Sequence, residues 1–259
     1  MSSILDNIYA AKRVEVRARR AVVSPMAIVA EAGRAPKPRD FIAALRSRRP
    51  AIIAEIKRAS PSKGDIMPGL DPANVAREYV AGGAAAISVL TDVHFKGTLD
   101  DLRAVCAAVE VPLLRKDFIF EPYQVYEARA AGADCILLIA AMLKEGELRS
   151  LAALARELGM ATLVEAHDAA ELALAEKIGA GLIGINNRDL HTFVTDIAVT
   201  ERLIAGYKGD ALIVTESGID TPDDVRGLDA AGARAFLIGE SLLRGGTPGA
   251  KLGELMRAL

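Results

Sequence analysis

Short apolar runs recur along the chain roughly every 25 residues between positions 51 and 250. They are AIIAEIK (51–57), AAISVL (85–90), VPLLRKD (111–117), CILLIA (135–140), ATLVEA (161–166), LIGIN (182–186), ALIVTE (211–216) and AFLIG (235–239). Gly-Ala precedes every second run, beginning at Gly83, Gly132, Gly179 and Gly232. Continuously apolar runs of this length are typical of strands buried on both faces of a parallel sheet. The repeat therefore predicts eight similar units, each built around one buried strand.

The stretches between these runs have helical periodicity. In LKEGELRSLAALARELG (143–159), apolar residues recur at three-and-four spacing, and Gly159 stands where a helix C-cap belongs. A parallel strand needs a crossover connection to reach its neighbour, and helices provide it. Eight such units in 259 residues predict a single (β/α)8 TIM barrel over residues 51–259. An open doubly wound sheet is the alternative, although no GxGxxG follows any run.

The first 50 residues fall outside the eight units and predict an N-terminal helical extension packed on the barrel. The segment ILDNIYAAKRVEVRARRA (4–21) predicts one helix, and a second is predicted from Pro38 to Arg46. The extension either plugs one mouth of the barrel or covers substrate. We treat the whole chain as one domain.

Composition and charge exclude several classes of function. Lys and Arg number 32 against 34 Asp and Glu, so the chain has no basic footprint for nucleic acid. The longest apolar run, residues 135–143, is too short to span a bilayer, and the N-terminus lacks the pattern of a secretory signal. We expect a cytoplasmic protein that contacts neither nucleic acid nor membrane, and the sequence identifies no protein partner.

The cysteines and histidines form no disulfide or metal pattern. Cys106 lies in a helical stretch and Cys135 begins a strand, so both are expected to be small core residues. His94, His167 and His191 lack metal-ligand spacing, and we expect all three to be exposed in loops. The sequence predicts no metal site.

Polar side chains stand at the C-terminal ends of five predicted strands. Catalytic groups of a TIM barrel come from these ends, and charges beside apolar strands are costly unless they are paired. Period-two spacing places Glu55 and Lys57 on the same side of the first strand, whereas Asp117 has the opposite parity to Lys116. The predicted catalytic residues are Glu55, Lys57, Lys116, Glu165, Asn186, Glu216 and Ser217.

Structural roles remain open for several of these residues. Glu55 and Lys57 are also consistent with a simple ion pair that closes the top of the barrel. Asn186 and Asn187 are also consistent with turn residues, and Glu216 with a buttress for a lysine. Lys116 has no obvious structural role.

Glycines follow the seventh and eighth strands, in Glu216-Ser217-Gly218 and Ile238-Gly239-Glu240. The loops after these two strands often bind phosphate through backbone N–H groups, and glycine permits a close approach. We expect Glu240 to contact an anion only through its backbone N–H.

The loop after the first strand, RASPSKGDIMPGL (58–70), is long for a βα connection. Ser60, Ser62 and Lys63 are donors suited to an anionic group. The loop is either a lid that excludes water or a long surface loop.

These residues together resemble the indole-3-glycerol phosphate synthase family. The resemblance rests on AEIKRASPSKG (54–64), LLRKDFI (113–119), LVEAHD (163–168), IGINNRDL (183–190), TESGI (215–219) and FLIGESLLR (236–244), and it covers essentially the whole chain. It implies ring closure of 1-(2-carboxyphenylamino)-1-deoxyribulose 5-phosphate, with loss of CO2 and water and without a cofactor, in tryptophan biosynthesis.

The resemblance also implies residue roles. Lys116 is similar to the general acid that polarises the ribulose carbonyl, Glu165 to its acid/base counterpart, and Lys57 to the lysine that meets the substrate carboxylate. Glu55 and Asn186 would orient the substrate, supported by Glu216 and Ser217. The implied substrate contacts are Ser60, Lys63, Phe118, Arg188, Gly218, Gly239 and Glu240. We expect Lys57 and Lys116 to lower the pKa of each other.

Two rival functions remain. A sister phosphate-binding barrel, phosphoribosylanthranilate isomerase, would use a Cys and an Asp, but the first strand offers Glu55 and Lys57. A non-catalytic barrel that binds a phosphorylated ligand would have no need of two lysines and two carboxylates at one mouth.

Overall fold

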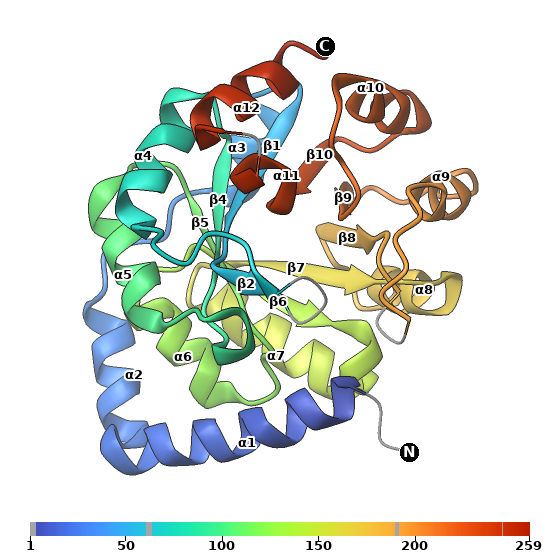
Figure 1. The fold of residues 1–259 in the computed structure, drawn as a ribbon. Helices are drawn as coiled ribbons and strands as arrows, with labels where there is room; N and C mark the ends of the chain where they lie inside the picture. The colour runs from blue at the N-terminus through green and yellow to red at the C-terminus, as the bar shows by residue number, and fades with distance from the viewer. Residues whose placement is uncertain (1–3, 61–63, 190–191, 245) are drawn as a thin grey trace.

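Eight parallel strands close into a barrel, which confirms the predicted fold (Figure 1). The computed structural model describes residues 4–60, 64–189, 192–244 and 246–259. The hydrogen-bonded order around the barrel is β1-β10-β9-β8-β7-β6-β5-β4, closing back on β1. The strands are β1 (Ala51–Ile56), β4 (Ala86–Leu90), β5 (Leu113–Lys116), β6 (Cys135–Ile139), β7 (Ala161–Ala166), β8 (Leu182–Asn186), β9 (Leu212–Glu216) and β10 (Ala235–Ile238). Each predicted apolar run forms one of them.

Helices cover the outside of the barrel (Figure 1). Asp71, Thr98, Asp168 and Thr221 each begin a helix by accepting a backbone N–H, which satisfies a donor that the helix leaves free. The helices are α4 (Pro72–Ala81), α5 (Leu99–Ala108), α6 (Pro122–Ala130), α7 (Glu145–Glu157), α8 (Ala169–Lys177), α9 (Ala198–Ile204), α10 (Pro222–Ala231), α11 (Glu240–Arg244) and α12 (Pro248–Met256), with short 3-10 turns η1 (Val93–Phe95) and η2 (Ala140–Met142).

Side chains of each strand alternate between two hydrophobic clusters. In β1, Ala51 and Ile53 belong to the cluster inside the barrel, whereas Ile52 and Ala54 pack towards the helices. The same alternation runs through the other strands, because successive side chains of a strand point to opposite faces. The last inward positions of β1, β5, β7 and β9 are therefore Glu55, Lys116, Glu165 and Glu216.

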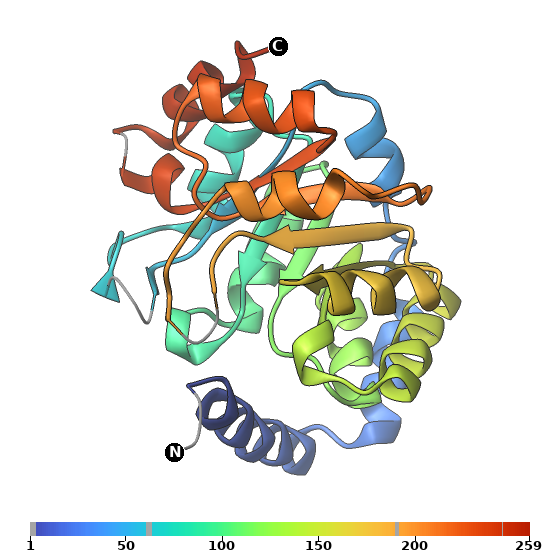
Figure 2. The same cartoon turned by 90° about the vertical axis from the view of Figure 1, so that its right-hand side faces the viewer.

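Three helices precede the barrel: α1 (Ile4–Val22), α2 (Pro25–Arg34) and α3 (Phe41–Arg46). Phe41 and Leu45 of α3 belong to the interior cluster together with Ala51 and Ala235, which begin their strands, so α3 closes the N-terminal mouth. Helix α2 packs against α6. Figures 1 and 2 show α1 along the lower edge of the molecule, outside the ring of barrel helices.

This N-terminal region differs from the prediction in two ways. Helix α2 was not predicted, although Ser24 caps it and Pro25 occupies its first turn, which are both helix-start signals. Helix α3 begins at Phe41 and not at Pro38, because the Asp40 side chain accepts the Ala43 N–H and sets the start there.

The loop after β1 contains a small antiparallel hairpin, β2 (Ala59–Ser60) and β3 (Gly64–Asp65). Arg58 at its base forms an ion pair with Asp101 at 2.7 Å. Ser62 and Lys63 lie outside the described residues. Across the described part of the chain, no helix is long and apolar enough to cross a membrane.

Candidate active site

A cavity of about 910 Å³ opens at the C-terminal ends of the strands, and residues from all eight strands line it. The sequence-predicted site residues in its lining are Glu55, Lys57, Ser60, Lys116, Phe118, Glu165, Asn186, Arg188, Glu216, Ser217, Gly218, Gly239 and Glu240. Lys63, a predicted substrate contact, and its neighbour Ser62 lie outside the described part of the chain. Side chains from distant parts of the sequence therefore meet at one mouth.

The floor of the cavity is a layer of charged side chains from alternate strands. Lys116 Nζ lies 2.6 Å from Glu216 Oε2 and 3.3 Å from Glu165 Oε2, and all three side chains are buried or nearly so. Beside them, Lys57 Nζ lies 2.7 Å from Glu55 Oε1. Interior side chains of a TIM barrel pack in layers of four from alternate strands, and here Glu55, Lys116, Glu165 and Glu216 occupy these positions.

The charged layer shows that one prediction, a lowered pKa for Lys116, is wrong. Burial alone would lower its pKa, but Glu216, Glu165 and Glu55 outweigh burial and raise the pKa above the ordinary lysine value. Lys57 faces Glu55 and does not act as the neighbour that lowers the pKa of Lys116. Lys116 is therefore a firmly charged ammonium in the free protein.

Three carboxylates around one ammonium also affect the acids. Burial raises the pKa of Glu216 to about 7, and Glu165 and Glu55 add to this rise although Lys116 opposes it. Burial alone would raise the pKa of Glu165 too, but Lys116, His167 and Asn186 lower it. Near neutral pH, Glu165 is an ionised carboxylate, whereas Glu216 is poised to hold a proton.

Asn186 connects the Glu165 carboxylate to the loop after β8. Its Nδ2 donates to Glu165 Oε1 at 3.2 Å, and its Oδ1 accepts from Ser217 Oγ at 2.9 Å and from the Arg188 N–H at 3.0 Å. Asn187 is the residue that holds the turn, since its amide binds Thr215, Ser217 and Thr200. Asn186 thus faces the cavity, whereas Asn187 stabilises the turn.

His167 was wrongly expected to be an exposed loop residue. Its side chain is 14% exposed, and its Nε2 lies 3.3 Å from Glu165 Oε1 while Nδ1 lies 3.0 Å from Glu171 Oε2. The sequence contained a usable signal, because Glu165 and His167 are two residues apart at a strand end, as Glu55 and Lys57 are.

The glycines after β9 and β10 shape the opposite side of the mouth. Ser217 and Gly218 have positive φ angles of 68° and 81°, so the backbone turns sharply there. A Cβ at Gly239 would lie 2.5 Å from Glu55 Oε1, so glycine is needed for Glu55 to fit. The Glu240 carboxylate faces Arg188 at 3.7 Å and Arg244 at 3.1 Å.

Sequence reasoning missed several lining residues. Arg244 and Lys251 add cations on the side of α11 and α12, and Ile8 reaches the cavity from α1. The placement of α1 depends on contacts with residues far along the chain, so no local sequence pattern predicts that Ile8 lines the cavity.

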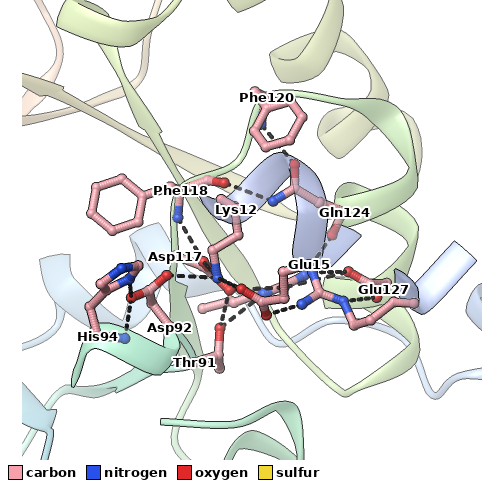
Figure 3. Close-up of polar contacts among 12 residues, drawn as sticks. Lys12, Glu15, Thr91, Asp92, His94, Asp117, Phe118, Phe120, Gln124 and Glu127 are labelled. Atoms are coloured by element: carbon pink, nitrogen blue, oxygen red, sulfur yellow. Dashed lines mark hydrogen bonds and ion pairs between the residues drawn. The ribbon is translucent and has the colours of Figure 1, made fainter. Parts of the chain in front are cut away.

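A buried ionic network holds α1 beside the mouth (Figure 3). Lys12 of α1 is fully buried, and its Nζ lies 2.7 Å from Asp92 and 2.9 Å from Asp117. Asp117 also pairs with Arg115 at 3.0 Å and accepts from Thr91 at 2.6 Å. Because Asp117 follows Lys116 directly, the helix is anchored next to the charged layer.

The fold and this cavity define a class of protein, a TIM-barrel enzyme with an acid–base site and flanking cations suited to a small anionic substrate. Among the described residues, no cluster of His, Cys, Asp and Glu is arranged to hold a metal ion.

The sequence profile of the indole-3-glycerol phosphate synthase family matches residues 5–255, and the chain belongs to this family. It is 48% identical over 260 residues to the indole-3-glycerol phosphate synthase of Albidiferax ferrireducens, covering 98% of both chains. It is 51% identical over 263 residues to that of Azoarcus sp. strain BH72, covering 98% of this chain and 99% of the relative.

Solved structures support the fold. Thiamine phosphate pyrophosphorylase from Pyrococcus furiosus is similar with a TM-score of 0.62 at 16% identity, over 82% of this chain and 96% of that one. N-acetylmannosamine-6-phosphate 2-epimerase from Clostridium perfringens has a TM-score of 0.62 at 15% identity, over 80% of this chain and 92% of that one. Family membership assigns the carboxy-lyase activity of tryptophan biosynthesis that acts on a phosphorylated small molecule, and the isomerase alternative is not favoured.

Proposed function

We propose that the charged layer at the C-terminal mouth performs the ring closure that defines the family, with Lys116 as its central residue. The observation that carries this proposal is the Lys116 ammonium, held 2.6 Å from Glu216 and 3.3 Å from Glu165 on the floor of the cavity. An ammonium fixed in a low-dielectric site stabilises negative charge as it develops in a transition state.

In the first step, the aromatic carbon that bears the carboxylate attacks the ribulose carbonyl carbon. Lys116 donates to the carbonyl oxygen, which becomes a hydroxyl. A developing alkoxide is basic enough to take this proton even from a lysine whose pKa is raised. Glu216, with its pKa raised to about 7, resupplies the proton to Lys116. Loss of CO2 then restores the aromatic ring.

In the second step, the new hydroxyl leaves as water and the indole forms. Lys57 meets the substrate carboxylate and protonates the departing hydroxyl. Glu165, an ionised base in the free protein, accepts the carbon-bound proton whose loss completes the aromatic system. Glu55 orients Lys57 at 2.7 Å, and Asn186 orients Glu165 at 3.2 Å.

The substrate phosphate binds on the side of the mouth formed by the loops after β9 and β10. Backbone N–H groups near Gly218, Gly239 and Glu240 are its contacts, together with Ser60. Arg188 supplies positive charge from the loop after β8, and Lys63 and Phe118 contact the rest of the substrate. The cytoplasmic location and the lack of nucleic-acid and membrane contacts stay predictions from the sequence.

A direct assay tests the function. The purified protein is mixed with 1-(2-carboxyphenylamino)-1-deoxyribulose 5-phosphate, and indole fluorescence is followed with and without a metal chelator. We expect steady product formation that neither the chelator nor a nicotinamide cofactor changes. Saturable binding without product would contradict the proposal and favour a binding protein, and turnover only of phosphoribosylanthranilate would favour the isomerase.

A further inference from the structure

His167 occupies a position behind the acid–base pair that the proposed mechanism does not use. It follows β7 by one residue, and its ring lies on the far side of Glu165 from Lys116: Nε2 is 3.3 Å from Glu165 Oε1, while Lys116 approaches Oε2. The same Oε1 accepts from Asn186 at 3.2 Å. The Glu165 carboxylate is therefore held by three side chains from three elements.

The ring is itself fixed by the start of α8. Asp168 caps this helix by accepting the Glu171 N–H at 2.8 Å, which brings Glu171 back over the preceding turn. Glu171 Oε2 then accepts the His167 backbone N–H at 2.8 Å and faces Nδ1 at 3.0 Å. A helix cap thus sets the orientation of the ring before any substrate arrives.

Both ring nitrogens of His167 face carboxylates, and the Nε2 contact with Glu165 is an ion pair at 3.3 Å and not an aligned hydrogen bond. A carboxylate only accepts hydrogen bonds, so Nδ1 carries a proton towards Glu171. If Nε2 carried none, its lone pair would face the Glu165 oxygen at 3.3 Å and repel it. An imidazolium removes the repulsion and adds an attraction to both carboxylates.

We propose that His167 is a positioning residue for Glu165, which holds the carboxylate ionised and aimed at the substrate from the side opposite Lys116. The inference rests on the proposed role of Glu165 as the base. Burial alone would lower the pKa of His167, but Glu165 and Glu171 raise it to about 10, so the ring stays charged through neutral pH.

Among the described residues, the charged groups paired with the ring come from two elements, Glu165 of β7 and Glu171 of α8. The turn η2, which also packs against α8, consists of Ala140–Met142 and has no titratable side chain. Lys116 of β5 reaches the ring only through Glu165. Removing the imidazolium therefore removes the cation on one side of Glu165 and raises the pKa of that acid.

The test is the pH profile of kcat/KM for three variants. His167→Asn keeps a short amide donor near Glu171 but does not reach Glu165, whereas His167→Gln offers Glu165 an uncharged donor. Glu171→Gln keeps an acceptor for the ring and removes its charge. We expect the acidic limb, which reports ionisation of the base in the free enzyme, to move up by about one pH unit or more in His167→Asn and by less in the other two.

His94 is the matched control. It makes the same local arrangement with Asp92, through its backbone N–H at 2.8 Å and Nδ1 at 2.9 Å, but it does not line the cavity. His94→Asn is expected to leave the acidic limb in place. The substrate phosphate titrates identically for every variant, so a difference between two profiles comes from the enzyme.

The outcomes separate this inference from the proposed function. An enzyme that turns over normally and keeps the wild-type acidic limb in His167→Asn overturns the inference alone, as does an equal shift in His94→Asn. A wild-type protein without turnover overturns the proposed function. If circular dichroism shows that His167→Asn does not fold, the pH profiles of His167→Gln and Glu171→Gln test the inference instead. Acidic limbs that are unshifted in both variants would overturn it.

Discussion

At the scale of single residues, the main feature is the imbalance of charge around Lys116. One ammonium faces three carboxylates of its layer, so its pKa is raised and that of Glu216 rises with burial to about 7. A lysine with a lowered pKa would give up its proton easily. In the proposed mechanism, Lys116 keeps its charge until the oxyanion develops, donates its proton there, and is reprotonated by Glu216.

Gly184 tests how strictly this layer is positioned. A Cβ at this residue would clash with Glu216 Oε1, so Gly184→Ala displaces the carboxylate that contacts Lys116. We expect kcat to fall by about 10-fold or more, because small misplacements of catalytic groups are costly. Steady-state kinetics with a urea unfolding curve measure the effect.

The control is Gly227→Ala in α10, where an added Cβ meets nothing within 4 Å. This change is expected to leave kcat unchanged and to raise stability by about 0.5–1 kcal/mol, because alanine favours helix over glycine. Wild-type kcat in Gly184→Ala would show that Glu216 tolerates displacement and is not part of the reacting layer.

At the scale of elements, α1 is joined to the barrel through a buried lysine (Figure 3). Lys12 has no exposed side-chain surface, and its partners Asp92 and Asp117 follow β4 and β5. One turn earlier on the same face, Ile8 lines the cavity. The network therefore couples the placement of the helix to the wall of the site.

Lys12→Met is expected to lower stability by about 3–5 kcal/mol, because it removes the buried ammonium that Asp92 and Asp117 share. We also expect KM to rise, because Ile8 loses its fixed position. Urea unfolding and steady-state kinetics measure the two effects. Arg17→Met, at an exposed position of the same helix, should change neither; equal effects of the two substitutions would contradict the role of the network.

The elements were largely predictable because their signals are local. Apolar runs such as CILLIA and the helix pattern of 143–159 are read directly from neighbouring residues, and they formed β6 and α7. Lys12 was not predictable in this way. Its burial depends on carboxylates 80 and 105 residues further along the chain, which only the closed barrel brings to it.

At the scale of the whole molecule, buried ion pairs predict how stability depends on pH. Burial alone would raise the pKa of Asp117, but Arg115 and Lys12 lower it below the ordinary range. A carboxylate with a lowered pKa stabilises the fold fully above its unfolded value of about 4 and loses this contribution as pH falls towards the folded value. The pKa of Lys12 is raised, so its contribution is lost only in strong alkali.

We therefore expect the free energy of unfolding to fall below about pH 4, as Asp117 is protonated. It should also fall as pH rises through the neutral range, because the folded pKa values of Glu216 and His167 are raised to about 7 and about 10. In Asp117→Asn, the stability at pH 7 should be lower and the acid slope shallower, by about 1.4 kcal/mol per pH unit for one titrating group. Urea unfolding curves between pH 2 and pH 7 measure both. An unchanged acid slope in the variant would contradict the account of Asp117.

At the scale of the whole molecule, the barrel also brings strand ends from distant parts of the sequence together at one site. The rule that strand ends of a barrel meet at one rim was sufficient to gather Lys116, Glu165 and Glu216 from sequence. The sign of the pKa shift at Lys116 was not predictable, because it depends on distances within the layer that no spacing rule provides. His167 was not predicted as a site residue, although its two-residue spacing from Glu165 at a strand end is a local signal.

The most direct test of the central claim is the kcat of Lys116→Met, which keeps the volume of the side chain and removes its charge. With a native circular dichroism spectrum, this variant should lose on the order of 10²–10⁴-fold in kcat, as expected for loss of a general acid. Lys208→Met, at an exposed position outside the cavity, should match the wild type. A folded Lys116→Met enzyme with near-normal kcat would contradict the account.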